Sequence, residues 1–300
     1  MRRSTVSVTA LVAGLASAAA AQNGTASCAT GLHLIVARGT SEPKGAGVTG
    51  LLADRIERQI AGSRVAPLDY PATLSKPDYE DSVAAGVQAM RSAVEQYAQE
   101  CPRSKVAIMG YSQGAQVSMD TLCGGTGAGF RSSTPLPAKL VKDNVVAIVL
   151  FGDPTHVANI TYDRGTSVKD GIFQRDNGTV RTCEAYADRM VSYCDTGDIY
   201  CDSGEDNKVH GLYVPRYGDE VVKYVVGRYH DSVKGEGGGR NSSASSTATA
   251  APTSSSATAS ATGARGSSGT ASAAPGRFVA DSSVYLALSS LALAALQALL

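Results

Sequence analysis

The segment Gly110-Tyr-Ser-Gln-Gly114 places a serine between two glycines, after the apolar run 106–109 and before a helix-forming stretch. A serine in this pattern occupies a sharp turn between a strand and a helix, which lifts its hydroxyl out of the backbone. The glycines are needed because neighbouring backbone approaches too closely for side chains. The alternative is an ordinary turn. Because the pentapeptide follows a buried strand and precedes a helix, we interpret Ser112 as a candidate nucleophile.

A serine hydroxyl is a poor nucleophile unless a base accepts its proton and an acid orients that base. The chain has four histidines. His33 lies in an apolar strand and suits a structural role, and His156 precedes the candidate acids, whereas the expected chain order is Ser, Asp, His. His230 lies in a closing helix, at its solvated end. His210, in the loop segment "EDNKVHGLYV", is the favoured base.

The acid is expected in "CDTGDIYC", residues 194–201. A disulfide between Cys194 and Cys201 would close a short loop and hold a carboxylate in place. Both Asp195 and Asp198 lie in that loop, and spacing does not distinguish them. We interpret Asp202, in the polar run that follows, as solvated.

Apolar segments alternate with helical patterns along the chain. Five segments are predicted to be strands and four to be helices; the strands are 32–40, 64–70, 104–111, 144–154 and 188–194, and the helices are 48–62, 79–100, 113–123 and 219–233. Nearly continuous apolar strands between helices predict an α/β fold, a three-layer α/β/α sandwich with a central five-stranded parallel sheet. Ligands bind such sheets at the carboxyl ends of the strands, where Ser112, Thr40 and Asp153 fall.

The two ends of the chain differ from this domain. Residues 1–21 have two arginines, an apolar run and Ala19-Ala20-Ala21, which predicts a secretory signal peptide. After the folded domain at 27–234, residues 235–275 are rich in Ser, Thr, Ala and Gly and predict a disordered, O-glycosylated stalk. Residues 276–300 end in an apolar tail that predicts a GPI-attachment signal, with Ser272 as the preferred attachment site. A plain transmembrane anchor is the alternative. We therefore expect a secreted protein held on the plasma membrane or cell wall.

Charge and cysteine content indicate which partners and which cellular compartment to expect. Positive and negative side chains balance at 27 each and no basic patch stands out, so we expect no nucleic-acid partner. No histidine has metal-ligand spacing, and no metal or cofactor is expected. Six cysteines in a secreted chain predict three disulfides, and we expect a monomer. Four N-glycosylation sequons fit the same compartment: Asn23, Asn159, Asn177 and Asn241.

Together, "GYSQG", "CDTGDIYC", a following loop histidine and "VARGTSEP" after the first strand resemble the fungal cutinase and acetylxylan esterase family over about residues 28–232. The resemblance implies Ser112 as nucleophile, His210 as base and Asp198 as acid. It also implies that Thr40 and the amide of Gln113 form the oxyanion hole. Both positions crowd the serine, as donors to a developing oxyanion must.

The resemblance also implies a disulfide pairing. Cys28 pairs with Cys101, since each precedes a strand and the two strands would be neighbours. Cys194 pairs with Cys201, which leaves Cys123 to pair with Cys183.

Within the family, this sequence is closer to the acetylxylan esterase branch. Cutinases have an apolar loop between acid and base, whereas this chain has the polar run "DSGEDNK". The stretches "GYSQGAQVSMDTLCGG" and "FGDP" are also similar to that branch. Tyr200 could stack on a sugar ring or simply pack. The implied function is a serine esterase that removes small acyl groups, with acetylated xylan as the expected substrate; the alternatives are a cutinase for longer polyester chains and an inactive cell-surface scaffold.

Overall fold

The computed structural model describes residues 28–127 and 129–238. The expected signal peptide, stalk and GPI signal, with Ser272, Asn23 and Asn241, lie outside the described residues. Across these two ranges, no helix has the length and apolar character needed to cross a bilayer.

The centre of the domain is a six-stranded sheet in the order β2-β1-β3-β4-β6-β5, and every neighbouring pair is parallel. The strands are β1 (Leu32–Ala37), β2 (Arg64–Pro67), β3 (Lys105–Tyr111), β4 (Val145–Phe151), β5 (Asp163–Gly165) and β6 (Met190–Cys194). The prediction of five strands is wrong by one. The additional strand, β5, has three residues at the sheet edge, and its sequence Asp-Arg-Gly has no apolar run that would mark it.

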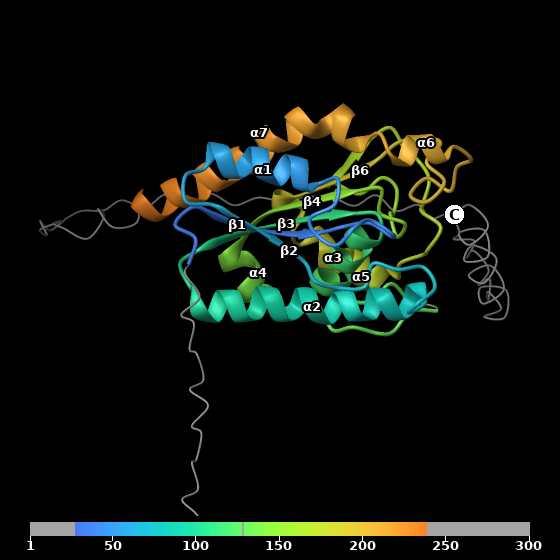
Figure 1. Ribbon diagram of the computed structural model, residues 1–300, viewed down its shortest axis with the longest axis horizontal. Helices are drawn as coiled ribbons and strands as arrows, with labels where there is room; N and C mark the ends of the chain where they lie inside the picture. Colours follow the sequence, from blue (N-terminus) through green and yellow to red (C-terminus); the bar gives the residue numbers. More distant parts are fainter. Residues whose placement is uncertain (1–27, 128, 239–300) are drawn as a thin grey trace, which may run out of the picture.

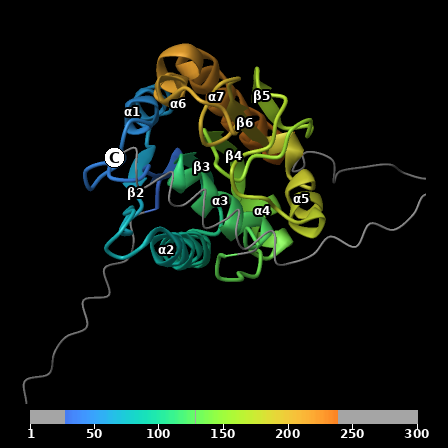
Figure 2. The ribbon, with the colours of Figure 1, turned by 90° about the vertical axis from the view of Figure 1, so that its right-hand side faces the viewer.

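Two helical layers cover the sheet, as Figures 1 and 2 show. One face carries α1 (Gly50–Gln59) and α7 (Tyr213–Gly238), and the other carries α2 (Tyr79–Glu100), α3 (Gln113–Cys123), α4 (Ala138–Asn144) and α5 (Asn177–Glu184). A short 3₁₀ helix, Ala187–Arg189, leads into β6, and α6 (Asn207–His210) lies at the carboxyl edge of the sheet. Helix α7 begins six residues before its predicted start at residue 219, which brings Tyr213 into it.

Apolar burial explains the arrangement. Strand β4, Val-Val-Ala-Ile-Val-Leu-Phe, is buried at every position, and β3 is buried at all but its two end residues. One core lies between the sheet and α2, α3, α4 and α5, and the other lies between the sheet, α1 and α7. Helix α3 is buried along its whole length, so the helix that follows Ser112 is held firmly on the sheet.

Three disulfides form in the pairing that the resemblance implies. The first, Cys28–Cys101, ties the segment before β1 to the end of α2. A second, Cys123–Cys183, joins the end of α3 to α5, and Cys194–Cys201 closes the loop after β6.

Candidate active site

Ser112 lies at the turn between β3 and α3 in a strained conformation, with φ 54° and ψ −119°. The flanking glycines are required by sterics. A Cβ at Gly110 would lie 2.5 Å from the carbonyl oxygen of Gly114, and one at Gly114 would lie 2.1 Å from that of Ala37. The turn therefore depends on both glycines, and it projects the hydroxyl above the carboxyl edge of the sheet.

Three side chains from separate elements form one hydrogen-bonded chain. Nε2 of His210 lies 2.9 Å from Oγ of Ser112, and Nδ1 of His210 lies 2.8 Å from Oδ2 of Asp198. Asp198 is fully buried and His210 is 6% exposed, so water competes little for these contacts. This geometry is that of a nucleophile, a base and an orienting acid. His210 is on the short helix α6 rather than in a plain loop.

The carboxylate of Asp198 is held from several sides. Tyr213 donates its hydroxyl to Oδ2 at 2.5 Å, and the amides of Tyr200 and Cys201 donate to Oδ1 at 2.8 and 3.1 Å. Burial acts to raise the pKa of Asp198, but the hydrogen bonds from His210, Tyr213 and the Tyr200 amide bring it below its ordinary value. The group is therefore ionised when His210 takes a proton.

The structure separates the other two aspartates from His210. Asp195 is buried against α7, where it accepts from Arg216 and Tyr217, each at 2.6 Å. The expectation that Asp202 is solvated is wrong: it is 1% exposed and accepts from the amide of Gly197 at 2.8 Å. Both carboxylates hold the loop that presents Asp198.

The remaining histidines lie away from Ser112. The ring of His33 stacks on Tyr97 with a centroid distance of 3.7 Å, and His156 is buried near Asp163. His230 is exposed on α7. All three positions agree with a structural or surface role.

Both proposed oxyanion donors lie beside the nucleophile. Thr40 lines the same pocket as Ser112. Gln113 is the first residue of α3, where a backbone amide has no intrahelical partner. The buried side chain of Gln113 accepts from Ser82 at 2.8 Å and donates to the carbonyl of Thr73 at 3.0 Å, which fixes the orientation of its backbone.

The loop that carries Thr40 is braced by two charged side chains. Glu42 accepts from the amides of Gly39 at 2.6 Å and Val48 at 2.8 Å, and Arg38 donates to the carbonyl of Glu42 at 3.0 Å. A loop tied back on itself in this way holds Thr40 at the wall of the pocket that Ser112 also lines.

These groups open into a cavity of about 160 Å³. Pockets for drug-sized ligands occupy roughly 300–1,000 Å³, so this one suits a small group. Aromatic and aliphatic side chains make most of its wall; the lining residues are Thr40, Tyr79, Tyr111, Ser112, Pro154, Ile172, Phe173, Tyr200, Asn207 and His210.

Three tyrosines lie around His210, and two of them, Tyr111 and Tyr213, were not predicted from the sequence. The ring of Tyr200, which was a candidate substrate-binding residue, lies edge-on to His210 at 4.5 Å, and that of Tyr111 lies at 5.1 Å. Tyr111 also donates its hydroxyl to the His210 carbonyl at 3.1 Å. Tyr111 is the second residue of the Gly-x-Ser-x-Gly motif, but no pattern marks Tyr213.

Two of the four N-glycosylation sequons lie within the described residues. Their asparagines, Asn159 and Asn177, are both exposed.

The α/β sheet, the turn at Ser112 and the hydrogen-bonded chain to Asp198 define a serine hydrolase. Comparison with known proteins is more specific: the Cutinase family model matches residues 28–229. The chain therefore belongs to the cutinase family of carboxylic ester hydrolases.

Both acetylxylan esterases and cutinases are similar to this chain. "Acetylxylan esterase 2" of Talaromyces purpureogenus is 30% identical over 201 residues, which cover 65% of this chain and 85% of that protein. "Cutinase 11" of Verticillium dahliae is 32% identical over 202 residues, covering 65% and 67%. The solved catalytic core domain of acetyl xylan esterase from Trichoderma reesei superposes with a TM-score of 0.61 at 30% identity, covering 66% of this chain and 98% of that one.

Proposed function

We propose that this protein is a serine esterase that removes acetyl groups from xylan, with Ser112, His210 and Asp198 as the catalytic triad. The observation that carries the proposal is the hydrogen-bonded chain of these residues at the mouth of a small cavity. Similarity to acetylxylan esterases supports the substrate.

In the proposed reaction, Oγ of Ser112 attacks the ester carbonyl carbon while Nε2 of His210 takes the hydroxyl proton. The oxygen of the tetrahedral intermediate takes on negative charge and accepts hydrogen bonds from the Thr40 hydroxyl and the Gln113 amide. His210 then gives its proton to the departing sugar oxygen as the ester bond breaks. Water, activated by His210, hydrolyses the acyl-enzyme and restores the serine.

The triad assignment is tested by substitution. Ser112→Ala and His210→Ala should each remove hydrolysis of nitrophenyl acetate and, for Ser112→Ala, labelling by a fluorophosphonate, while circular dichroism remains that of the folded protein. His230→Ala is the matched control, because that ring is exposed and distant from the site, and it should retain most activity. Loss of activity in His230→Ala with retention in His210→Ala would overturn the assignment of the base.

The substrate is tested by measuring kcat/KM for acetyl, butyryl, octanoyl and palmitoyl nitrophenyl esters, together with acetate release from acetylated xylan. We expect activity to be highest for acetyl or butyryl esters and acetate to be released. A profile that rises to octanoyl, with no acetate released, would instead favour a cutinase, the second candidate that the Verticillium dahliae relative supports.

We further propose that the enzyme is an extracellular monomer attached to the cell surface by a GPI anchor. Three disulfides support an oxidising compartment. The composition of residues 235–300 supports the anchor.

A further inference from the structure

The pocket has two chemically different ends. His210 borders one of them, together with the ring of Tyr111 and the polar side chain of Asn207. Tyr79 and Phe173, whose ring centroids are 5.7 Å apart, line the pocket from the core on the side of α2 and α3. Tyr200 contacts His210 and also packs against that core, so it lies between the two ends.

The chemistry decides which part of an ester occupies each end. His210 must pass its proton to the leaving oxygen, so the alcohol portion lies at the His210 end. With the carbonyl oxygen between Thr40 and Gln113, the acyl chain extends from Ser112 away from His210.

Tyr79 lies on this acyl side, because α2 and α6, which carries His210, are on opposite sides of the sheet (Figures 1 and 2). It is the first residue of α2, and its hydroxyl donates at 2.9 Å to Gln116, one helical turn beyond Ser112 on α3. We propose that the ring of Tyr79, backed by Phe173, is the wall that limits the acyl chain and restricts the enzyme to acetyl and other very short acyl esters. This inference rests on the proposed esterase function and names its specificity determinant.

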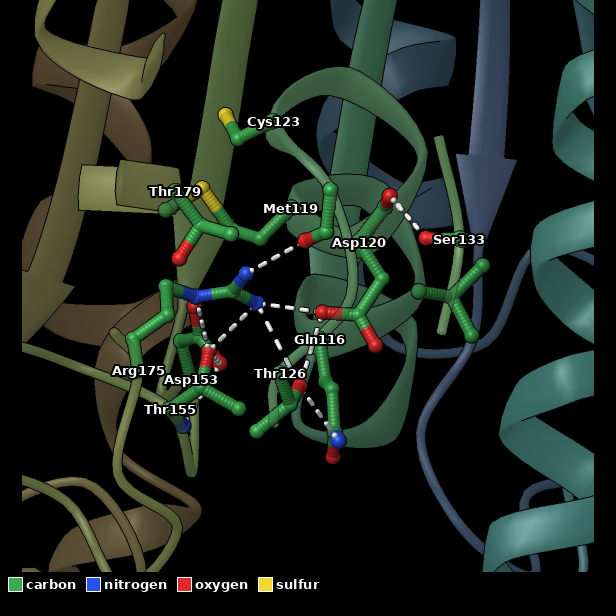
Figure 3. Close-up of polar contacts among 12 residues, drawn as sticks. Gln116, Met119, Asp120, Cys123, Thr126, Ser133, Asp153, Thr155, Arg175 and Thr179 are labelled. Carbon is green, nitrogen blue, oxygen red and sulfur yellow. Dashed lines mark hydrogen bonds and ion pairs between the residues drawn. The ribbon is translucent and has the colours of Figure 1, made fainter. Parts of the chain in front are cut away.

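The hydroxyl of Tyr79 is bonded to a buried polar network, of which Figure 3 shows Gln116, Thr126, Asp120 and Arg175. Gln116, which accepts from the Tyr79 hydroxyl, donates through Nε2 to Thr126 at 3.0 Å, and Thr126 donates to Asp120 at 2.7 Å. Burial raises the pKa of the Tyr79 phenol well above its ordinary value, so it remains a neutral donor. Tyr79 is 2% exposed, so the ring has little space to move although it lines the pocket.

The same network anchors the second half of the wall. Arg175, two residues after Phe173, donates to Asp120 at 2.5 Å, to the carbonyl of Gly124 at 2.8 Å and to the Thr155 hydroxyl at 3.0 Å. The amide of Phe173 also donates to the Pro154 carbonyl at 2.9 Å. The Phe173 ring itself is held by packing, since it is 5% exposed and contacts the rings of Tyr79 and Phe130. With the Tyr79 hydroxyl bonded to the network, a longer acyl chain cannot easily displace either ring.

The test is the acyl-length profile of Tyr79→Ala. Removing the ring opens space beyond the acetyl group, and each further methylene that becomes buried favours binding by about 0.8 kcal/mol, or about fourfold. We expect the ratio of kcat/KM for butyryl over acetyl esters to rise at least tenfold relative to wild type. Phe173→Ala should shift the ratio in the same direction, and it carries the test if Tyr79→Ala does not fold.

Two control variants distinguish the effect of removing the wall from a general loss of structure. Tyr97→Ala removes another buried tyrosine ring from α2, at the far end of the helix, and should leave the ratio unchanged. Tyr79→Phe keeps the ring and removes only the bond to Gln116, so its ratio should stay within about threefold of wild type.

The outcomes separate this inference from the function beneath it. If wild type hydrolyses no ester and takes no fluorophosphonate, the proposed function fails. If wild type favours acetyl esters but neither Tyr79→Ala nor Phe173→Ala raises the ratio, the wall lies elsewhere and only this inference is overturned. An equal rise in Tyr97→Ala would also overturn it.

Discussion

His210 is positioned by contacts on every side at the scale of single residues. Asp198 fixes one ring nitrogen, Tyr111 holds its carbonyl, and Tyr200 covers one edge of the ring. Behind the ring lies the backbone of Gly152, the residue after β4. Such an enclosed imidazole has one orientation, and small changes around it should affect catalysis more than stability.

Gly152→Ala should slow catalysis sharply. Gly152 has φ 58°, and a Cβ there would lie 2.7 Å from Cε1 and 2.9 Å from Nδ1 of His210. The methyl group would push the imidazole off Ser112, and a displacement of about 1 Å can cost on the order of a hundredfold in rate. Steady-state kinetics on nitrophenyl acetate measure the effect.

Gly227→Ala is the control for this substitution. Gly227 lies in α7, and a Cβ added there would meet no heavy atom of another element within 4 Å. Alanine at this position should therefore leave kcat unchanged and slightly raise stability. If Gly152→Ala has wild-type kcat, Gly152 does not constrain His210 as described.

Short connections between elements do much of the positioning. The acid loop after β6 is closed by Cys194–Cys201, seven residues apart, and Sγ of Cys201 lies 3.1 Å from the hydroxyl of Tyr213. By contrast, Cys28–Cys101 spans 73 residues at the opposite edge of the sheet. The short bridge should therefore position the acid loop, whereas the long bridge should mainly stabilise the fold.

Replacing Cys194 and Cys201 by alanine should lower kcat while reducing stability only moderately. In the chain-entropy treatment a short loop contributes about 2 kcal/mol and a loop of this longer span about 4 kcal/mol. The alanine pair at Cys28 and Cys101 should do the reverse, with a larger fall in Tm and a near-normal kcat in the folded fraction. Equal kcat values in the two double variants would contradict the positioning role of the short bridge.

His33 on β1 stacks against Tyr97 on α2, and this buried imidazole should make the free energy of unfolding depend on pH. Burial, and then the nearby charge of Arg64, lower the pKa of His33 to about 4. The unfolded chain has an ordinary imidazole pKa near 6.5, so it binds more protons than the folded chain between these values. The contribution of His33 is complete above about pH 6.5 and is lost as pH falls toward 4.

His33→Phe should reduce this loss, because a neutral ring can still stack on Tyr97. Comparing urea unfolding at pH 7.5 and 4.5, we expect the variant to lose less stability than wild type by on the order of 1 kcal/mol, allowing for partial exposure of the ring. His230→Gln, at an exposed position, should lose as much as wild type. An equal loss in His33→Phe would show that His33 does not drive the acid sensitivity.

The sequence predicts those elements whose signal is local. Strands β3 and β4 are buried on both faces, so their sequences are apolar throughout, and the turn at Ser112 requires its two glycines. Strand β5 is defined by its pairing with β6 alone, and nothing in its sequence Asp-Arg-Gly marks it.

Burial that arises from tertiary contacts was not predictable in the same way. Asp202 belongs to a polar run, yet it is buried because the amide of Gly197 and the hydroxyl of Ser167 donate to it. Tyr79 and Phe173 come together only when α2 and the segment before α5 meet, so no spacing could identify the wall that they form.

At the scale of the whole molecule, the site and the two ends of the described domain, Cys28 and Gly238, lie at opposite ends of the strands. Helix α7 begins beside Asp198 and runs for 26 residues, about 39 Å, to the other end. There the hydroxyl of Tyr229 lies 3.5 Å from the carbonyl of Thr30, next to Cys28 at the start of the described domain.

The proposed anchor is tested on cells. Phosphatidylinositol-specific phospholipase should release esterase activity into the medium, and Ser112→Ala should be released equally without activity. Recovery from the mature protein of a peptide that ends at Leu300 would contradict GPI processing.

The course of α7 has a practical consequence. The described domain begins and ends at the amino ends of the strands, and the pocket opens at their carboxyl ends. A partner fused before Cys28 or after α7 would therefore face away from incoming substrate. Coupling the domain to a bead or a carbohydrate-binding module through either end should therefore leave access to Ser112 open, whereas attachment through lysines such as Lys208, within α6, would obstruct it.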